Sequence, residues 1–331
     1  MLRLAGGLLL VLAVALSFSW LFFMQDGSGN AEPVAPQAAK RDGFAADRDN
    51  GFQASRAMRY LGEVCKIGPR ISGTEGMKRQ QKLLEAHFAA LDGKVAFQRF
   101  TARQKSQKQP VEMANLIVSW HSERPRRIIL CTHYDTRPIA DQEPDRRKWQ
   151  EPFVSANDGG TGVALLMEFG HLAKDLTTPV GIDLVFFDGE EYVFNPGPQG
   201  DLYFLGSEYF ARNYAASRPK RRYEAAILLD MIGGQNAQFP VEQNSWFKAG
   251  ALVQELWRIA AQEKCGAFRD ALGPEVLDDH LALNKAGIPA VDIIDFSYPH
   301  WHRLSDVPAN CAADSLGQVA RVLIAWLQQI K

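Results

Sequence analysis

Hydrophobic residues between positions 51 and 331 follow two alternating patterns. One is helical, with an apolar residue every three or four positions; the other is a short and nearly continuous apolar run. The helical pattern predicts helices at 52–65, 75–91, 160–174, 207–214, 246–264, 279–285 and 312–330. The continuous runs predict strands at 95–100, 115–120, 127–133, 182–187, 226–229 and 290–294.

Strands that are apolar on both faces need cover on both sides, and strands that alternate with helices usually pair in parallel. The pattern therefore predicts an α/β fold, a three-layer α/β/α sandwich with a central, mostly parallel, mixed sheet. In such sheets ligands bind beyond the carboxyl ends of the strands. We therefore expect functional side chains in the segments that follow each predicted strand.

The start of the chain has a different pattern, because residues 4–24 are almost wholly apolar. About 20 such residues are enough for a helix to cross a hydrocarbon core of about 30 Å. No A-x-A-like site directly follows them, which favours an uncleaved anchor over a cleaved signal peptide. Arg3 precedes the segment and Lys40 is the next basic residue, so the N-terminus is expected to stay inside.

Three segments are therefore predicted. Residues 1–24 form a signal-anchor, residues 25–50 form a flexible linker rich in Gly, Ala, Pro and charge, and residues 51–331 form the catalytic domain. We expect this domain to lie outside the cytoplasm, held at the membrane by the anchor or secreted if the anchor is cleaved. We also expect a monomer.

Composition narrows the classes of partner. Lys+Arg 37 against Asp+Glu 38 gives a net charge of -1, which offers no basic surface for nucleic acid. The four cysteines are far apart and form no C-x-x-C, so neither a disulfide scaffold nor a zinc ribbon is expected. Buried thiols are the simpler interpretation, although one disulfide bond in an oxidising compartment stays open.

Acidic and imidazole side chains gather where the central strands end. Five segments carry them, namely Thr132–Asp135, Ser155–Gly160, Asp188–Glu191, Asp230 and His300–His302. Carboxylates that converge at one edge of a sheet repel one another, and a bound cation removes this repulsion. Carboxylate and imidazole ligands without paired thiolates suit Zn²⁺ or a similar divalent ion.

A catalytic zinc ion needs three protein ligands and an open position. We assign Asp158, Glu191 and His302 as these ligands. Neighbouring residues on an extended backbone point in opposite directions, so Glu190 is free to act as general base beside the metal. Asp135 lies two residues after His133 and is expected to orient its imidazole.

Other catalytic motifs are missing from the sequence. It contains no H-E-x-x-H, no G-x-S-x-G and no G-x-x-x-x-G-K-[ST]. The glycine-rich run Asp158–Gly162 lacks the lysine of a phosphate-binding loop, so a helix start that presents Asp158 is the simpler interpretation.

The motifs together resemble zinc exopeptidases of the bacterial leucyl aminopeptidase type and, within them, the glutaminyl-peptide cyclotransferases. The resemblance covers most of residues 51–331 and implies a zinc-exopeptidase-like fold. It rests on THYD (132–135), ANDGGTG (156–162), FFDGEE (186–191), LYFLGS (202–207), LLDMIG (228–233), DDH (278–280) and WHRLSD (301–306).

The resemblance implies the same three zinc ligands and Glu190 as the acid/base. In two-zinc aminopeptidases the counterparts of His133 and Asp230 bind a second ion, with that of Asp158 as the bridge. In the cyclases one zinc is bound, and the counterparts of Asp278 and Asp230 form a hydrogen-bond chain with the base.

Peptide or protein N-termini are the substrate that the resemblance implies. Trp301, immediately before the ligand histidine, is cyclase-like and is expected to line a small apolar substrate pocket with Phe296 and Tyr298. The insertion between FFDGEE and LYFLGS is also cyclase-like. Against this, Tyr192 to Asn195 lack the tryptophan usual after GEE in cyclases.

Two functions therefore stay open. The first is a cyclase with one zinc ion, which converts N-terminal glutamine to pyroglutamate; the second is an aminopeptidase with two. A receptor-like domain without activity is a third alternative, but such domains typically lose ligands or the base, and all are present here.

Overall fold

The structure of the protein is a computed structural model that describes residues 50–217 and 222–331. A central sheet of six strands has the order β1-β2-β4-β3-β5-β8. Strands β3, β4, β5 and β8 are parallel, while β2 runs antiparallel to both β1 and β4. The strands are β1 (Lys94–Ala102), β2 (Val111–Trp120), β3 (Arg126–His133), β4 (Gly181–Phe187), β5 (Arg222–Asp230) and β8 (Ala290–Ile294).

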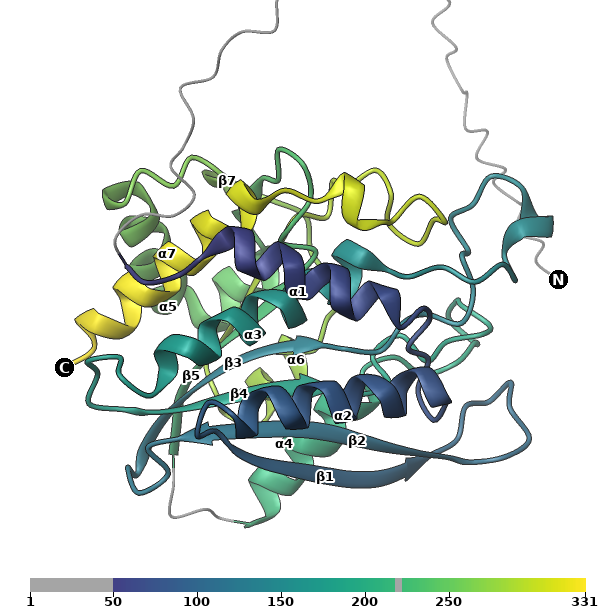
Figure 1. The fold of residues 1–331 in the computed structure, drawn as a ribbon, viewed down its shortest axis with the longest axis horizontal. Coiled ribbons are helices and arrows are strands. Elements are labelled where there is room, and N and C mark those ends of the chain that lie inside the picture. The colour runs from purple at the N-terminus through teal and green to yellow at the C-terminus, as the bar shows by residue number, and fades with distance from the viewer. Residues whose placement is uncertain (1–49, 218–221) are drawn as a thin grey trace, which may run out of the picture. The chain divides into compact units, whose positions relative to one another are not determined.

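Helices cover both faces of this sheet (Figure 1). On one face the core contains side chains of α1, α2, α3, α5 and α7, and on the other it contains those of α4 and α6. The helices are α1 (Ala54–Lys66), α2 (Glu75–Ala89), α3 (Thr161–Ala173), α4 (Leu205–Ser217), α5 (Gln243–Gln262), α6 (His280–Lys285) and α7 (Ala313–Gln329). The predicted three-layer α/β sandwich with a mixed sheet is thus confirmed.

The two faces of β3 show why its middle, residues 128–131, is continuously apolar. Ile128 and Leu130 pack into the larger core, whereas Ile129 and Cys131 pack into the smaller core on the other face. Successive side chains of a strand alternate between faces, so the middle of a strand that is covered on both sides is apolar at every position.

A second, two-stranded sheet was not predicted. It pairs β6 (Phe239–Val241) with β7 (Phe268–Leu272) in parallel. Only three residues form β6, and four of the five residues of β7 are exposed, so neither strand has a clear hydrophobic pattern. Their position is set by tertiary packing beside the start of α5 rather than by local sequence.

Cys65, Cys131, Cys265 and Cys311 are all buried. The predicted anchor 1–24 and nearly all of the linker 25–50 lie outside the described residues. Among residues 50–217 and 222–331, no helix is both long and apolar enough to cross a membrane.

The side chain of Glu242 fixes the start of α5. Its carboxylate accepts hydrogen bonds from the backbone N–H of Ser245 at 2.6 Å and of Val276 at 3.0 Å, and one oxygen lies 3.3 Å from His280 Nε2. Burial alone would raise the pKa of Glu242, but the nearby His280 and the hydrogen bonds from these amides lower the pKa to about 2. The ionised carboxylate therefore stabilises the folded state.

Replacing this carboxylate by an amide in Glu242→Gln should lower the free energy of unfolding at pH 7 by about 2 kcal/mol, as expected for hydrogen bonds to a charged group. The folded-state pKa lies below the ordinary value of 4.5. The contribution is therefore present above pH 4.5 and is lost as the pH falls towards 2. Urea denaturation of both proteins at a series of pH values measures the difference.

Glu255→Gln, a change of the same type in the body of α5, is the matched control and should alter the free energy of unfolding little at any pH. A stability gap between wild type and Glu242→Gln that does not narrow on acidification would contradict this role of the Glu242 charge.

Candidate metal centre and active site

The carboxyl ends of the parallel strands carry the candidate residues, as the rule for open α/β sheets requires. Strand β3 ends at His133 and β5 ends at Asp230. Glu190 and Glu191 follow β4, and the loop after β8 brings His302 to the same edge of the sheet. Each of these residues except His133 lines one hollow, and His133 contacts Asp158, which also lines it.

Asp158, Glu191 and His302 form the first group of metal-ligand atoms. Their ligand atoms all lie within 4.8 Å of one another. His302 Nε2 is 3.2 Å from a Glu191 oxygen and 3.5 Å from Asp158 Oδ2. The three side chains are almost completely buried. The residues assigned from sequence as zinc ligands are therefore close enough to share one ion.

His133, Asp158 and Asp230 form a second group with the same spacing limit. His133 Nε2 lies 3.0 Å from Asp158 Oδ1 and 3.2 Å from Asp230 Oδ1. Asp158 belongs to both groups, with Oδ2 directed to the first and Oδ1 to the second. This is the arrangement that a bridging carboxylate between two metal positions requires.

A tight turn at residues Ala156–Gly160 presents Asp158. Asp306 fixes this turn, since its carboxylate accepts the backbone N–H of Asn157 at 2.8 Å and of Asp158 at 3.2 Å. Gly159 has a φ of 76°, and a Cβ there would lie 2.7 Å from His133 Cε1. Only glycine fits this position, which explains the glycine that follows the ligand.

Asp135 holds the segment that carries Glu190 and Glu191. Its two carboxylate oxygens accept the backbone N–H of Glu190 at 3.2 Å and of Glu191 at 3.0 Å. Its distance to His133 Nδ1 is 3.7 Å, longer than a hydrogen bond. The orientation of His133 by Asp135 therefore stays a prediction, and the structure adds a role for Asp135 in fixing the loop after β4.

Glu190 and Glu191 approach different imidazoles, as their adjacency predicts. A Glu190 oxygen lies 3.8 Å from His133 Nδ1, whereas Glu191 contacts His302. Burial, followed by the charge of Glu191, raises the pKa of Glu190 well above its ordinary value. Burial alone would also raise the pKa of Glu191, but Arg137 and His302 outweigh it and hold that pKa well below its usual range.

Arg137 and Asp141 complete the first ligand group, and sequence analysis missed both. Arg137 is buried and donates to Glu191 Oε2 at 3.0 Å and to Asp141 Oδ2 at 3.0 Å. The other oxygen of Asp141 lies 2.8 Å from His302 Nδ1. Arg137 and Asp141 follow the THYD motif by two and six residues, and their spacing of four residues was the only available signal.

The residues fit a zinc ion. Each group offers carboxylate and imidazole donors and no thiolate, which suits Zn²⁺. Asp158 Oδ2 is buried without a hydrogen-bond partner among the described residues, as expected of an atom reserved for a cation. Asp141 lies against the outer nitrogen of His302 and so orients its Nε2 towards the other ligands, as partners of metal-binding histidines do.

Asp278 lies in the same hollow and is 5% exposed. Burial raises its pKa well above the ordinary value, and the charges of Asp230 and Asp279 raise it further. Asp278 in turn raises the pKa of Glu190. The charge of Asp230 thus acts on Asp278, and the charge of Asp278 acts on Glu190.

The hollow has a volume of about 370 Å³ and is walled on one side by aromatic rings. Phe296 and Trp301 line it with ring centroids 5.0 Å apart, as expected from sequence. The expectation that Tyr298 binds substrate is wrong for this structure. Tyr298 is buried outside the hollow, and its hydroxyl donates to Asp306 Oδ1 at 2.8 Å, so it supports the Asp158 turn instead.

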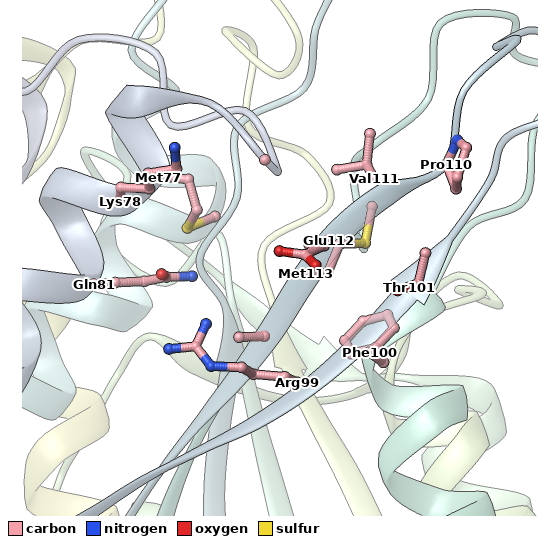
Figure 2. A pocket seen from close by; sticks show the side chains of 12 residues that line it. Met77, Lys78, Gln81, Arg99, Phe100, Thr101, Pro110, Val111, Glu112 and Met113 are labelled. Atoms are coloured by element: carbon pink, nitrogen blue, oxygen red, sulfur yellow. The ribbon is translucent and has the colours of Figure 1, made fainter.

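A larger hollow of about 490 Å³ lies between α2 and the β1–β2 hairpin (Figure 2). Lys78, Arg99 and Glu112 are the charged residues that line it, and neither histidine nor cysteine is among its lining residues. It therefore has no group of metal ligands, and the hollow at the strand ends is the candidate active site.

Fold and ligand groups together define the class of metal-dependent exopeptidase-type α/β proteins. The pattern of peptidase family M28 matches residues 115–327. The chain belongs to this family.

Similar solved structures include both glutaminyl cyclases and an aminopeptidase precursor, whereas the similar curated proteins include glutaminyl-peptide cyclotransferases. The chain is 47% identical to a glutaminyl cyclase of Fimbriiglobus ruber, with a TM-score of 0.83 and coverage of 85% of this chain and 96% of that one. It is 30% identical to a leucine aminopeptidase precursor of Bacteroides thetaiotaomicron, with a TM-score of 0.79 and coverage of 85% and 98%. A glutaminyl-peptide cyclotransferase-like protein of Bos taurus is 25% identical over 285 residues, which cover 78% of this chain and 72% of the relative.

Removal of the shared ligand should abolish binding at both positions, so Asp158→Asn is expected to purify without zinc. Asp230→Asn changes only the second group and should leave the first occupied. Elemental analysis of the purified proteins counts the zinc ions, and circular dichroism verifies that each variant is folded. Full zinc content in Asp158→Asn would exclude this site.

Asp141→Ala removes the carboxylate next to the outer nitrogen of His302. Loss of such a partner typically weakens metal binding about 10- to 100-fold. Competition with a chromogenic zinc chelator measures the affinity. Asp145→Ala, which removes a half-buried carboxylate from the same loop, is the control and should bind zinc as wild type does. Equal affinities in both variants would contradict the role of Asp141.

Proposed function

We propose that the chain is a zinc-dependent glutaminyl-peptide cyclotransferase, which converts the N-terminal glutamine of a peptide to pyroglutamate and releases ammonia. The observation that carries this proposal is the position of Glu190. It lies in one hollow with the first group of ligands and with Trp301 and Phe296. The similarity to the glutaminyl cyclase of Fimbriiglobus ruber, which the chain covers over 96% of its length, supports it.

Cyclisation needs a group that removes a proton from the α-amine and returns one to the leaving nitrogen. Zinc held by Asp158, Glu191 and His302 would supply Lewis-acid polarisation of the γ-carbonyl. Glu190 accepts the proton from the α-amine as its nitrogen forms a bond to the γ-carbon. The bond from this carbon to the side-chain nitrogen then breaks, and Glu190 donates the proton to the departing ammonia.

The walls of the hollow suit a glutaminyl side chain. Trp301 and Phe296 enclose its methylene groups and exclude water from the reacting atoms. Asp230 and Asp278 line the same hollow as Glu190, where their carboxyl oxygens can accept hydrogen bonds from the α-amino group of a peptide. Burial, followed by the charges of Glu191 and Asp278, raises the pKa of Glu190, which favours its uptake of the proton from the α-amine.

A second candidate function is a two-zinc aminopeptidase. The observation that favours it is the complete second group of His133, Asp158 and Asp230. Two ions held by the two ligand groups would activate the water that attacks the first peptide bond, and Glu190 would accept the proton of this water. The 30% identity to the leucine aminopeptidase precursor supports this candidate less strongly than the 47% identity to a cyclase supports the first.

The variant Glu190→Gln tests the proposal, because it removes the base and keeps the ligands. It should retain zinc and lose cyclisation about 10²- to 10⁴-fold, the usual contribution of proton transfer. Mass spectrometry of a Gln-initiated peptide follows the loss of ammonia. Glu143→Gln, which lies outside the hollow, should keep the wild-type rate.

Two results would count against a cyclase. One is cyclisation at the wild-type rate in Glu190→Gln, which would show that Glu190 is not the general base. The other is release of leucine from Leu-initiated peptides by a protein with two zinc ions per chain, without cyclisation of Gln-initiated peptides. That outcome selects the aminopeptidase.

The apolar N-terminal segment bears on where in the cell the proposed activity takes place. We propose that residues 1–24 anchor the chain in a membrane and that residues 51–331 act as a monomer on its extracytoplasmic side. The full chain should stay with the membrane fraction after an alkaline wash, and a chain starting at Gly51 should be soluble. A full chain released by the wash would contradict the anchor.

A further inference from the structure

A second hollow adjoins the candidate active site. It has a volume of about 340 Å³ and lies between the small β6–β7 sheet and the loop after β8. Val276, Ile294 and Phe296 line both hollows, so one layer of side chains separates them. Phe296 is 43% exposed and forms the top of this wall.

A bound peptide can extend from the first hollow over Phe296 into the second. If the N-terminal glutamine occupies the first hollow, as the proposed function requires, the following residues must leave past its rim. An extended chain advances about 3.3–3.6 Å per residue. The second or third residue therefore reaches the far side of Phe296.

The two acids in the second hollow are already used by the fold. Asp295 Oδ1 accepts from Ser297 and Asp295 Oδ2 accepts the backbone N–H of Gln238. Glu242 caps α5 through both of its oxygens. Both acids are at least 95% buried, so neither offers a free negative charge to a ligand.

Arg269 is the basic residue of this hollow, and its side chain is free. It is exposed, and within residues 50–217 and 222–331 its guanidinium makes no hydrogen bond or ion pair. Its backbone carbonyl accepts from Trp257 Nε1 at 3.0 Å, which holds the strand in place. A fixed strand thus presents an unpaired positive charge to the hollow.

We propose that the second hollow is a substrate subsite for the residue that follows the N-terminal glutamine by one or two positions, and that Arg269 selects a carboxylate there. The preferred substrate class is then a Gln-initiated peptide with an acidic second or third residue, or a short one with a free C-terminal carboxylate. The first hollow, which is lined by acids, offers no such partner. Discrimination between peptides therefore arises at Arg269, outside the reacting centre.

Steady-state kinetics on matched peptide amides tests this subsite. The amides are Gln-Ala-Glu, Gln-Ala-Gln, Gln-Ala-Lys and Gln-Glu-Ala. Two further substrates are glutamine amide, which is the minimal substrate, and the dipeptide Gln-Ala with a free C-terminal carboxylate. Wild type should favour an acidic peptide over its neutral counterpart about two- to fivefold in kcat/KM, the size expected of an exposed ion pair. The preference should lie in KM and should weaken as ionic strength rises.

Charge reversal gives the sharper result. Arg269→Gln should remove the preference and Arg269→Glu should transfer it to Gln-Ala-Lys. Glutamine amide does not reach the second hollow, so its kcat/KM should stay at the wild-type value in both variants. Arg99→Gln removes an exposed arginine from the hollow of Figure 2 and should leave the preference intact.

Three outcomes overturn the subsite. They are equal kcat/KM for acidic and neutral peptides in wild type, a preference that survives Arg269→Glu, and an equal loss on glutamine amide in the Arg269 variants. Failure of the wild type to cyclise glutamine amide overturns the proposed function instead. The same charge series on Leu-initiated peptides then tests Arg269.

Discussion

Mutual repulsion between buried carboxylates is the constraint on which the rest of this structure depends. Asp158, Glu190, Glu191, Asp230 and Asp278 meet at one edge of the sheet, almost without access to water. Such a group is stable only if protons, cationic side chains or metal ions compensate its charge. The surrounding groups meet this need, because Arg137 and two histidines contact these acids and a backbone amide donates to Asp278. The loops after the strands are shaped by electrostatics more than by packing.

Much of the fold was predictable, because buried strands and amphipathic helices leave a clear period in the sequence. The strand predicted at 290–294 has the same bounds as β8, and each long helix lies within a few residues of its predicted position. The β6–β7 sheet was not predictable, since its strands are short and β7 is mostly exposed. Local sequence carries no signal for strands that exist only because neighbouring elements place them.

The site residues, too, separate into those that could be predicted from sequence and those that could not. Asp158, Glu191 and His302 could be predicted because parallel strands bring their carboxyl ends together, so the positions after the strands converge whatever the loops do. Arg137, Asp141 and the actual partner of Tyr298 could not, because they depend on where loops fold back. Asp135 is an example. Its spacing from His133 predicted a contact with that imidazole, but spacing gave no sign that Asp135 also accepts hydrogen bonds from the backbone of the loop after β4.

The buried thiols have a practical consequence. Cys65 and Cys311 pack in one small cluster with Ala156, the first residue of the turn that presents Asp158. Burial raises the pKa of both thiols, so in the closed fold they are protonated as well as inaccessible. An alkylating reagent reaches them only when this cluster opens. The rate at which a reagent labels Cys65 and Cys311 therefore reports how often the turn that carries Asp158 opens. This measurement uses the protein's own cysteines and needs no introduced probe.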